Sequence, residues 1–225
     1  MALETARVKL VSVFAQRCVY LFAGLLTLIV MVPFFEASMQ GRVLLNFVNI
    51  FILAMAAVAV SNSRVCFTLA VVLAGATIGC QVGAIVWTES HLLQMSRASG
   101  AALYFLTVCY LLDYVFRNEV LTIDKLYGAA SAFLMLGILW VYIYTIVLHF
   151  YPGAITAGGQ PVADPSLSEM LYFSFTALTT TGFGDILPVH PVARMVCVIE
   201  QIVGVLFIAI LIARLASTYR PGEGH

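Results

Sequence analysis

Six long apolar runs with little charge dominate this chain of 225 residues and constrain its fold more than any other feature. A run of about 20 apolar residues can cross the hydrocarbon core of a bilayer as a helix. The runs are, in chain order, Cys18–Phe35, Val43–Val60, Val65–Trp87, Ala98–Phe116, Leu126–Tyr151 and His190–Ser217. Only 10% of the residues are charged, against roughly 25% in soluble domains. The sequence therefore predicts an all-α membrane protein with six transmembrane helices.

The basic residues divide unevenly between the two ends of these runs. If the N-terminus lies inside the cell, the inner side holds most of them: Arg7, Lys9, Arg17, Arg64, Arg117, Lys125, Arg214 and Arg220. The outer side then holds Arg42, Arg97 and Arg194. Because Lys and Arg concentrate on the cytoplasmic side, we expect a multi-pass protein of the cell membrane with both termini in the cytoplasm. Residues 1–17 form either an interfacial amphipathic segment or a frayed tail.

Composition argues against several classes of function. The formal net charge is zero, which argues against a nucleic-acid partner. The five cysteines are widely spaced within apolar runs, and we interpret them as packing residues. The four histidines form no metal-ligand spacing such as HExxH, so an enzyme has little support. The tail 219–225 is too short for a soluble ligand-binding domain, and the expected surroundings are membrane lipids.

The segment Pro152–Pro188 differs from the apolar runs on either side of it. Within it, Ser166-Leu167-Ser168-Glu169 has the S-x-x-E pattern of a capping box, and apolar and aromatic residues follow as far as Leu178. The helix predicted over 166–178 is roughly 16–20 Å long, which is about half of a bilayer. The chain is therefore expected to enter the membrane and turn back.

The return path begins with Thr179-Thr180-Thr181-Gly182-Phe183-Gly184-Asp185. Non-helical backbone at membrane depth is tolerated only where it is buried in protein or lines water. Gly182 and Gly184 permit backbone angles that are closed to other residues, so successive carbonyls can point the same way and replace the hydration shell of a cation. The C-terminus of the half-helix, which carries a partial negative charge, would favour a cation in the pore interior. The pattern predicts a pore element.

The segment Thr180-Thr181-Gly182-Phe183-Gly184-Asp185 resembles the filter signature of potassium channels, usually written TVGYGD. Leu171-Tyr172-Phe173-Ser174 is similar to the pore helix of that family, and Ile186-Leu187-Pro188 is similar to the usual exit from the filter. The resemblance runs from Leu167 to about Leu215 and is strongest to the prokaryotic two-helix pore family.

This resemblance implies a homotetramer, because each chain supplies one of the four loops that make a filter. It implies that dehydrated K⁺ ions bind the backbone oxygens of Thr180, Thr181, Gly182 and Phe183, in a filter that also includes Gly184. The Thr180 hydroxyl would form the innermost site. K⁺ ions are therefore the expected bound species.

The residues expected to support the filter are Thr179, Asp185, Tyr172, Phe173, Thr176 and Glu200. Asp185 would brace the filter from behind. Glu200 is a costly carboxylate inside the last apolar run, and we expect it to bond the pore helix rather than line the cavity. Gly204 falls where the family often has a hinge glycine. Ile208 and Ile212 follow on the same helical face and form either a hydrophobic gate or plain bundle packing.

Three positions depart from the common pattern of the family. Phe183 replaces a tyrosine whose hydroxyl usually ties the filter to its surroundings. Thr181 replaces a valine and adds a hydroxyl behind the filter. Thr176 stands where some members have a glutamate that pairs with the filter aspartate. These changes bear on the stability of the filter and hence on inactivation.

The predicted organisation is a four-helix membrane domain, 18–118, followed by a pore domain, 119–218, which contains the pore helix 166–178, the filter 179–185 and the inner helix 190–217. Four helices before a pore invite comparison with a voltage sensor, but a sensor needs several arginines along one membrane helix. The fourth apolar run has Arg97 at one end and Arg117 at the other, with none between. We therefore expect a potassium-selective channel that is not strongly voltage-gated.

Two other functions stay open at this point. A non-selective channel would pass Na⁺ and K⁺ alike, although relaxed filters often lose the aromatic or the second glycine that Phe183-Gly184 retains. A carrier would usually show an internal repeat, and we find no convincing second copy of the segment 166–188.

Overall fold

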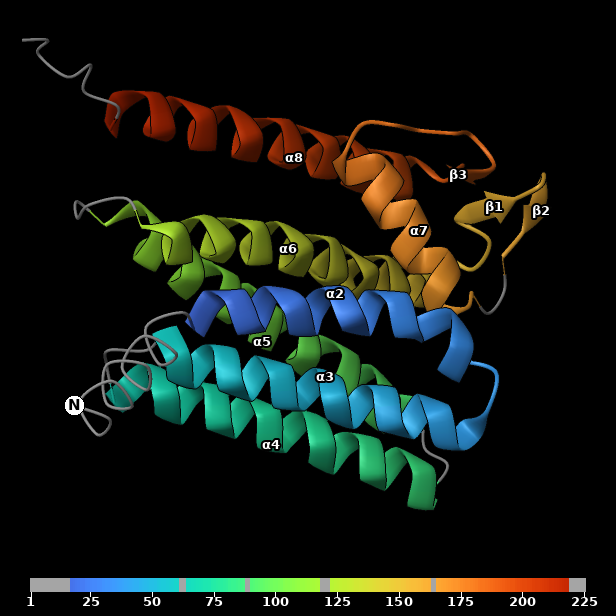
Figure 1. Ribbon diagram of the computed structural model, residues 1–225. Coiled ribbons are helices and arrows are strands. Elements are labelled where there is room, and N and C mark those ends of the chain that lie inside the picture. The colour runs from blue at the N-terminus through green and yellow to red at the C-terminus, as the bar shows by residue number, and fades with distance from the viewer. Residues whose placement is uncertain (1–16, 61–63, 88–89, 118–121, 163–164, 219–225) are drawn as a thin grey trace, which may run out of the picture.

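The computed structural model describes residues 17–60, 64–87, 90–117, 122–162 and 165–218. These residues form seven helices and three short strands (Figure 1). The elements are α2 (Arg17–Phe35), α3 (Met39–Val60), α4 (Arg64–Trp87), α5 (Ser90–Phe116), α6 (Ile123–Phe150), β1 (Ile155–Ala157), β2 (Gln160–Pro161), α7 (Leu167–Leu178), β3 (Ile186–Pro188) and α8 (Pro191–Thr218). The predicted N-terminal segment 1–17, apart from Arg17, and the tail 219–225 lie outside the described residues.

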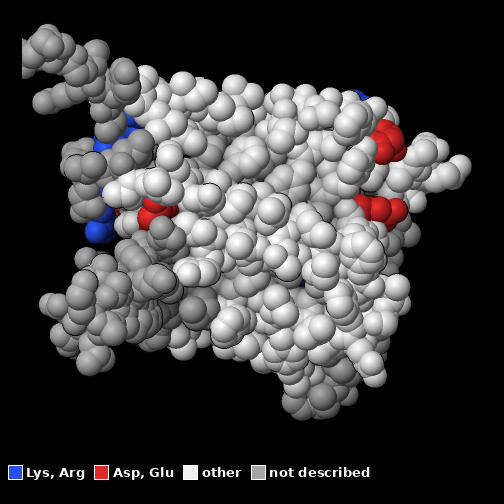
Figure 2. Space-filling view, viewed as in Figure 1, with Lys and Arg blue, Asp and Glu red and all other residues white. Residues whose placement is uncertain are grey.

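Four helices, α2, α5, α6 and α8, are long and apolar enough to cross a membrane. The described parts of α3 and α4 contain shorter apolar stretches, Gln40–Leu53 and Val71–Gly83. On the face drawn in Figure 2, charged side chains lie near the two ends of the molecule and a wide uncharged band separates them. This distribution is that of a multi-pass membrane protein, while six transmembrane helices stay a prediction.

The largest difference from the predicted boundaries is the start of α5. The predicted apolar run starts at Ala98, whereas the helix begins at Ser90. Polar side chains at this end of α5 bond to α4: Ser96 Oγ, in the added turns, donates to Thr77 O (3.4 Å), and Thr77 Oγ1 donates to Ser99 Oγ, just after them (3.0 Å). Hydropathy marks the apolar part of a helix, and polar contacts between helices let the helix itself extend further.

Helix α6 lies at the centre of the arrangement. Helices α2 and α5 pack against it, and so do α7 and α8 (Figure 1). Met135 and Tyr144 of α6 are fully buried, as are Leu25 of α2 and Leu111 of α5. The segment that contains α7 and α8 is therefore held against the first four helices of the same chain.

Within the described part of the chain, helix α8 is covered mainly along one face. It contacts α6, α7 and β3, and it exposes a series of large apolar side chains that includes Val198, Ile202, Val205, Ile208 and Ile212. An exposed apolar surface of this length is typical of contact with lipid or with another protein.

The segment between α6 and α7 forms part of a small antiparallel sheet that the sequence analysis did not predict. Strand β1 lies between β2 and β3. The turn from β1 to β2 is Gly158-Gly159, with φ angles of 57° and 80°, as a two-residue hairpin turn requires. Gly158 N also donates to Asp185 O (3.0 Å). The sheet therefore ties the end of the predicted filter to the loop that precedes α7.

Candidate functional site

Helix α7 begins directly after the N-cap that the S-x-x-E pattern predicts. Ser166 Oγ accepts a hydrogen bond from Glu169 N (3.1 Å), and Glu169 Oε2 accepts one from Ser166 N (2.9 Å). The helix has 12 residues, so it is about 18 Å long. It packs against α6 and α8. Because it is less than half as long as these helices, the following loop begins partway along their length.

The loop after α7 turns its N–H groups back toward the helix. Thr181 N and Gly182 N both donate to Thr176 O, at 2.9 and 3.2 Å. In a trans peptide the carbonyl points opposite to the N–H of the same peptide group, and the described residues contain no cis peptide bond. The carbonyl oxygens of Thr180 and Thr181 therefore point away from α7, side by side.

Every second residue of this loop has a positive φ angle: Thr180 (57°), Gly182 (55°) and Gly184 (84°). Glycine adopts such angles without a steric penalty, but a β-branched threonine does so at a cost of roughly 1–2 kcal/mol. Backbone strain persists where the surroundings impose it, and it concentrates at functional sites. The sequence analysis anticipated the two glycines but not the strain at Thr180.

Threonine hydroxyls lie between α7 and the loop. Thr179 Oγ1 donates to Phe175 O (2.7 Å) and lies 2.8 Å from Thr181 Oγ1. Thr176 Oγ1 donates to Phe173 O (2.9 Å) within the helix. Thr176 therefore holds the loop through its backbone carbonyl, and the hydroxyl that Thr181 adds is paired with that of Thr179.

The ring of Phe183 lies parallel to the ring of Tyr172 on α7, with an interplanar angle of 6° and centroids 6.1 Å apart. The Tyr172 hydroxyl interacts with the Asp185 carboxylate at the end of the loop. Partial desolvation raises the pKa of Tyr172, and the hydrogen bond and negative charge of Asp185 raise it further. The phenol therefore stays protonated and donates. Phe183 has no hydroxyl, and Tyr172 on helix α7 supplies one beside it.

The chain beyond Asp185 is fixed by β1 and by the first turn of α8. Asp185 Oδ1 accepts from Ile186 N (3.1 Å). Val189 N donates to Ala154 O (2.9 Å), and Arg194 Nε donates to a carbonyl of β3 (3.2 Å). Both ends of the loop are thus anchored, one by α7 and the other by the sheet.

The side of α7 that packs on α6 and α8 contacts a buried carboxylate. Glu200 of α8 is fully buried; its Oε1 lies 2.6 Å from Ser174 Oγ, and its Oε2 accepts from the Tyr144 hydroxyl (2.5 Å). Ser174 Oγ also lies 2.8 Å from Gly137 O, so one hydroxyl proton is shared between two acceptors. Phe173 packs on Tyr144, with ring centroids 4.8 Å apart. Glu200 and Tyr144 thus contact the side of α7 that carries Phe173 and Ser174, and the support of the filter by Glu200 and Phe173 stays a prediction.

The sequence analysis did not single out Tyr144 or Ser174 as partners of Glu200. A polar residue in an apolar run is a signal of such a contact, but a single sequence does not say which polar residues meet.

Gly204 lies where α8 crosses the end of α7. A Cβ atom at this position would lie 1.9 Å from the carbonyl oxygen of Leu178. Helix α8 is continuous through Gly204, so the glycine here serves a close approach of two helices, and its role as a hinge stays a prediction. Ile208 and Ile212 lie further along α8 and are 46% and 59% exposed in the single chain.

This arrangement presents neutral oxygen atoms rather than charged ligands. Among the described residues, no group of three His, Cys, Asp or Glu side chains is placed to hold a metal ion. The loop instead offers the carbonyls of Thr180 and Thr181, held in place from both ends. Neutral oxygens of this kind can replace the water around a monovalent cation.

Comparison with known proteins agrees with this geometry. Residues 131–220 match a protein family described as "Ion channel". The chain is also 37% identical over 71 residues to "Potassium channel protein kcv" of Paramecium bursaria Chlorella virus 1, a match that covers 30% of this chain and 73% of the viral protein. No solved structure matches the chain.

A half-helix and an anchored loop held between two membrane helices define the pore module of a membrane channel. The chain belongs to the ion-channel family that includes this viral potassium channel. The matched residues begin in α6 and include α7 and α8, so helices α2 to α5 precede them.

Proposed function

We propose that this chain is one subunit of a homotetrameric channel that conducts K⁺ selectively and passively across the cell membrane. The observation that carries the proposal is the backbone of residues 180–184. Its φ angles are positive at every second position, and the carbonyls of Thr180 and Thr181 turn away from α7. Four such stretches around one axis would surround a cation with oxygen atoms.

Surface exposure supports assembly of several copies. Phe183 is 71% exposed in the single chain, and the apolar side chains of α8 are exposed with it. A tetramer built around the loop would bury both surfaces against neighbouring subunits. Membrane lipids would cover the remaining apolar surface of the spanning helices, six in each subunit, with both termini in the cytoplasm.

In this tetramer, dehydrated K⁺ binds the backbone oxygens of Thr180, Thr181, Gly182 and Phe183, and the Thr180 hydroxyl forms the innermost site. The C-terminus of α7, with its partial negative charge, faces an ion in the cavity below the filter. Ile208 and Ile212 then lie toward the inner end of the pore, where apolar side chains can close it by excluding water.

The test is ion flux through purified protein in liposomes, with K⁺ and Na⁺ gradients compared in parallel. We expect K⁺ flux well above Na⁺ flux. In Gly182→Ala, the backbone must hold an alanine at a φ of 55°, which is strained for a residue with a Cβ atom. We therefore expect the preference for K⁺ to fall by about tenfold or more. Gly75→Ala is the matched control, because a Cβ there meets no atom within 4 Å. Equal K⁺ and Na⁺ flux through the unmodified chain would instead indicate a non-selective cation channel.

A further inference from the structure

The N-terminus of α7 receives more hydrogen-bond acceptors than its own capping box supplies. The first N–H groups of a helix have no partner within the helix. The capping box satisfies two groups here, Ser166 N through Glu169 Oε2 and Glu169 N through Ser166 Oγ. The N–H groups of Leu167 and Ser168, between them, need an acceptor from elsewhere.

Glu36, just beyond the end of α2, provides that acceptor with both oxygens of its carboxylate. Leu167 N donates to Glu36 Oε1. Ser168 N and Ser168 Oγ donate to Glu36 Oε2, at 3.1 and 2.7 Å. A carboxylate at a helix N-terminus is further stabilised by the helix dipole. The two glutamates and Ser166 together leave none of the four N–H groups without a partner.

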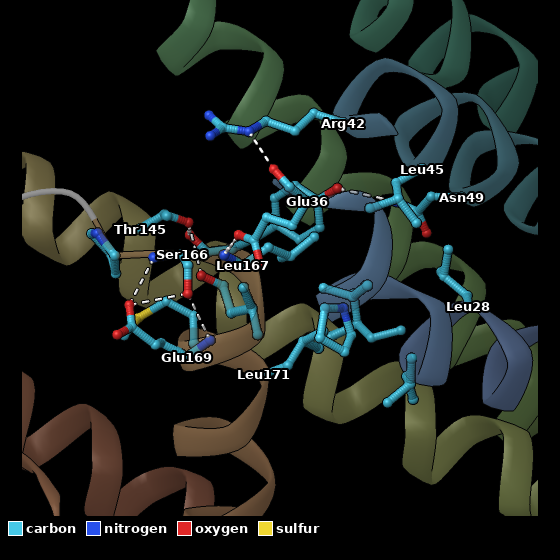
Figure 3. A pocket seen from close by; sticks show the side chains of 18 of the residues that line it. Leu28, Glu36, Arg42, Leu45, Asn49, Thr145, Ser166, Leu167, Glu169 and Leu171 are labelled. Atoms are coloured by element: carbon cyan, nitrogen blue, oxygen red, sulfur yellow. Dashed lines mark hydrogen bonds between the residues drawn. The ribbon is translucent and has the colours of Figure 1, made fainter. Parts of the chain in front are cut away.

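The backbone of Glu36 is itself fixed, so the side chain is held in place rather than loosely attached. Glu36 N donates to Val32 O in the last turns of α2 (2.9 Å). Glu36 O accepts from Arg42 Nε of α3 (2.9 Å). The carboxylate therefore connects α7 to two helices of the four-helix domain (Figure 3).

The connection through Glu36 adds to a limited direct packing of α2 against α7. A cavity of about 720 Å³ lies beside it, lined by residues of both α2 and α7, among them Leu28, Val32, Glu36, Leu167 and Leu171 (Figure 3). Because the space between the two helices is partly open there, the polar contacts of Glu36 contribute to their relative position together with the packing of both helices on α6.

The other end of α7 holds the filter, since Thr176 O accepts from Thr181 N and Gly182 N. A helix of three turns moves as one body, so a shift at Ser168 displaces Thr176 as well. We propose that Glu36 is a positioning residue for the filter, through which the four-helix domain sets the geometry of the K⁺ sites. This inference rests on the proposed function, and it goes beyond the matched pore module because Glu36 lies outside residues 131–220.

The experiment measures K⁺ affinity of the purified, assembled channel by titration calorimetry, with Na⁺ as the background cation. In Glu36→Ala two N–H groups lose their acceptor, and we expect K⁺ affinity to fall by about tenfold. Glu36→Gln keeps one acceptor oxygen, so its loss should be intermediate. Ser38→Ala is the matched control, because Ser38 Oγ accepts from Gly41 N at the start of α3 (3.0 Å) and caps a helix other than α7. Its K⁺ affinity should stay within about twofold of the unmodified chain.

A double-mutant cycle keeps the test decisive if Glu36→Ala fails to assemble. Because Ser168 Oγ donates to Glu36, the combined effect of Glu36→Gln and Ser168→Ala should be smaller than the product of the two single effects. Unchanged K⁺ affinity in assembled Glu36→Ala, or independent effects in the cycle, would overturn the role of Glu36. An unmodified chain that binds no K⁺ would contradict the proposed function instead.

Discussion

At the scale of single residues, the proposed ion site depends on backbone rather than on side-chain chemistry. The loop after α7 has positive φ angles at Thr180, Gly182 and Gly184, and two of these are glycines because only glycine adopts such angles freely. Gly204 serves a different purpose, since it allows α8 to pass against the end of α7. Tyr172 adds a phenolic hydroxyl that interacts with Asp185.

Gly204→Ala should destabilise the protein. The added Cβ would lie 1.9 Å from Leu178 O, so α8 must move away from α7, at a cost of about 1–3 kcal/mol. We expect a lower melting temperature in detergent. Gly75→Ala should be neutral or slightly stabilising, because its Cβ meets nothing and alanine favours the helix. Equal melting temperatures for Gly204→Ala and the unmodified chain would contradict the close approach.

Tyr172→Phe should loosen the filter without removing the ring that stacks on Phe183. The interaction of the hydroxyl with Asp185 is lost, and we expect K⁺ current to decline faster during sustained recording. The pH dependence has a defined sign, because the pKa of Tyr172 is raised above 10.0. The stabilisation is fully present below pH 10.0 and is lost as pH rises through the raised pKa. The difference between Tyr172→Phe and the unmodified chain should therefore vanish only in strong alkali; a difference that vanishes near neutral pH would refute the assignment.

At the scale of elements, α7 is held at three points along its length. Its start is capped by Glu36 and by its own capping box. Its middle is bonded through Ser174 to Glu200 of α8. Its end carries the loop through the carbonyl of Thr176. A helix fixed in this way can present backbone carbonyls with the accuracy that ion recognition needs.

Glu200→Ala tests the middle attachment. The change leaves the hydroxyls of Tyr144 and Ser174 without their carboxylate partner and opens a cavity, so we expect a loss of about 2–4 kcal/mol in unfolding free energy. Gln201→Ala, at the next and only half-buried position, should cost much less. Chemical unfolding in detergent measures both, and similar losses for the two variants would show that the Glu200 contacts contribute little.

The elements that local signals specify were predictable from the sequence, and those that depend on distant contacts were not. The S-x-x-E pattern before Leu167 marks the start of α7, and Gly182 and Gly184 mark the loop. Gly158-Gly159 is a local signal of the same kind, for a β-hairpin. A search for apolar runs does not detect it. The contact of Glu36 with Leu167 spans 131 residues, and nothing local in a single sequence shows which helix ends meet.

At the scale of the whole molecule, the first four helices lie against the pore module of the same chain, through the contacts of α2 and α5 with α6. One face of α8 is exposed in the single chain, and in the proposed tetramer it would contact other copies of the chain and lipid. Between Arg97 and Phe116 the helix α5 contains no Lys or Arg, so it offers the membrane field few charges to move.

Opening should therefore depend weakly on voltage. Steady-state conductance, recorded from reconstituted protein at about −100 to +100 mV, a range that includes the resting potentials of cells, should change gradually. A steep sigmoid that moves several charges in each subunit would contradict this expectation.

In the proposed channel, backbone oxygens of four chains replace the water around one ion. The most direct test is anomalous diffraction from crystals of the assembled channel grown with Tl⁺ in place of K⁺. The account predicts a row of Tl⁺ peaks on a fourfold axis, between the carbonyls of Thr180, Thr181, Gly182 and Phe183. An assembly without a shared axis at this loop, or Tl⁺ peaks away from these oxygens, would contradict it.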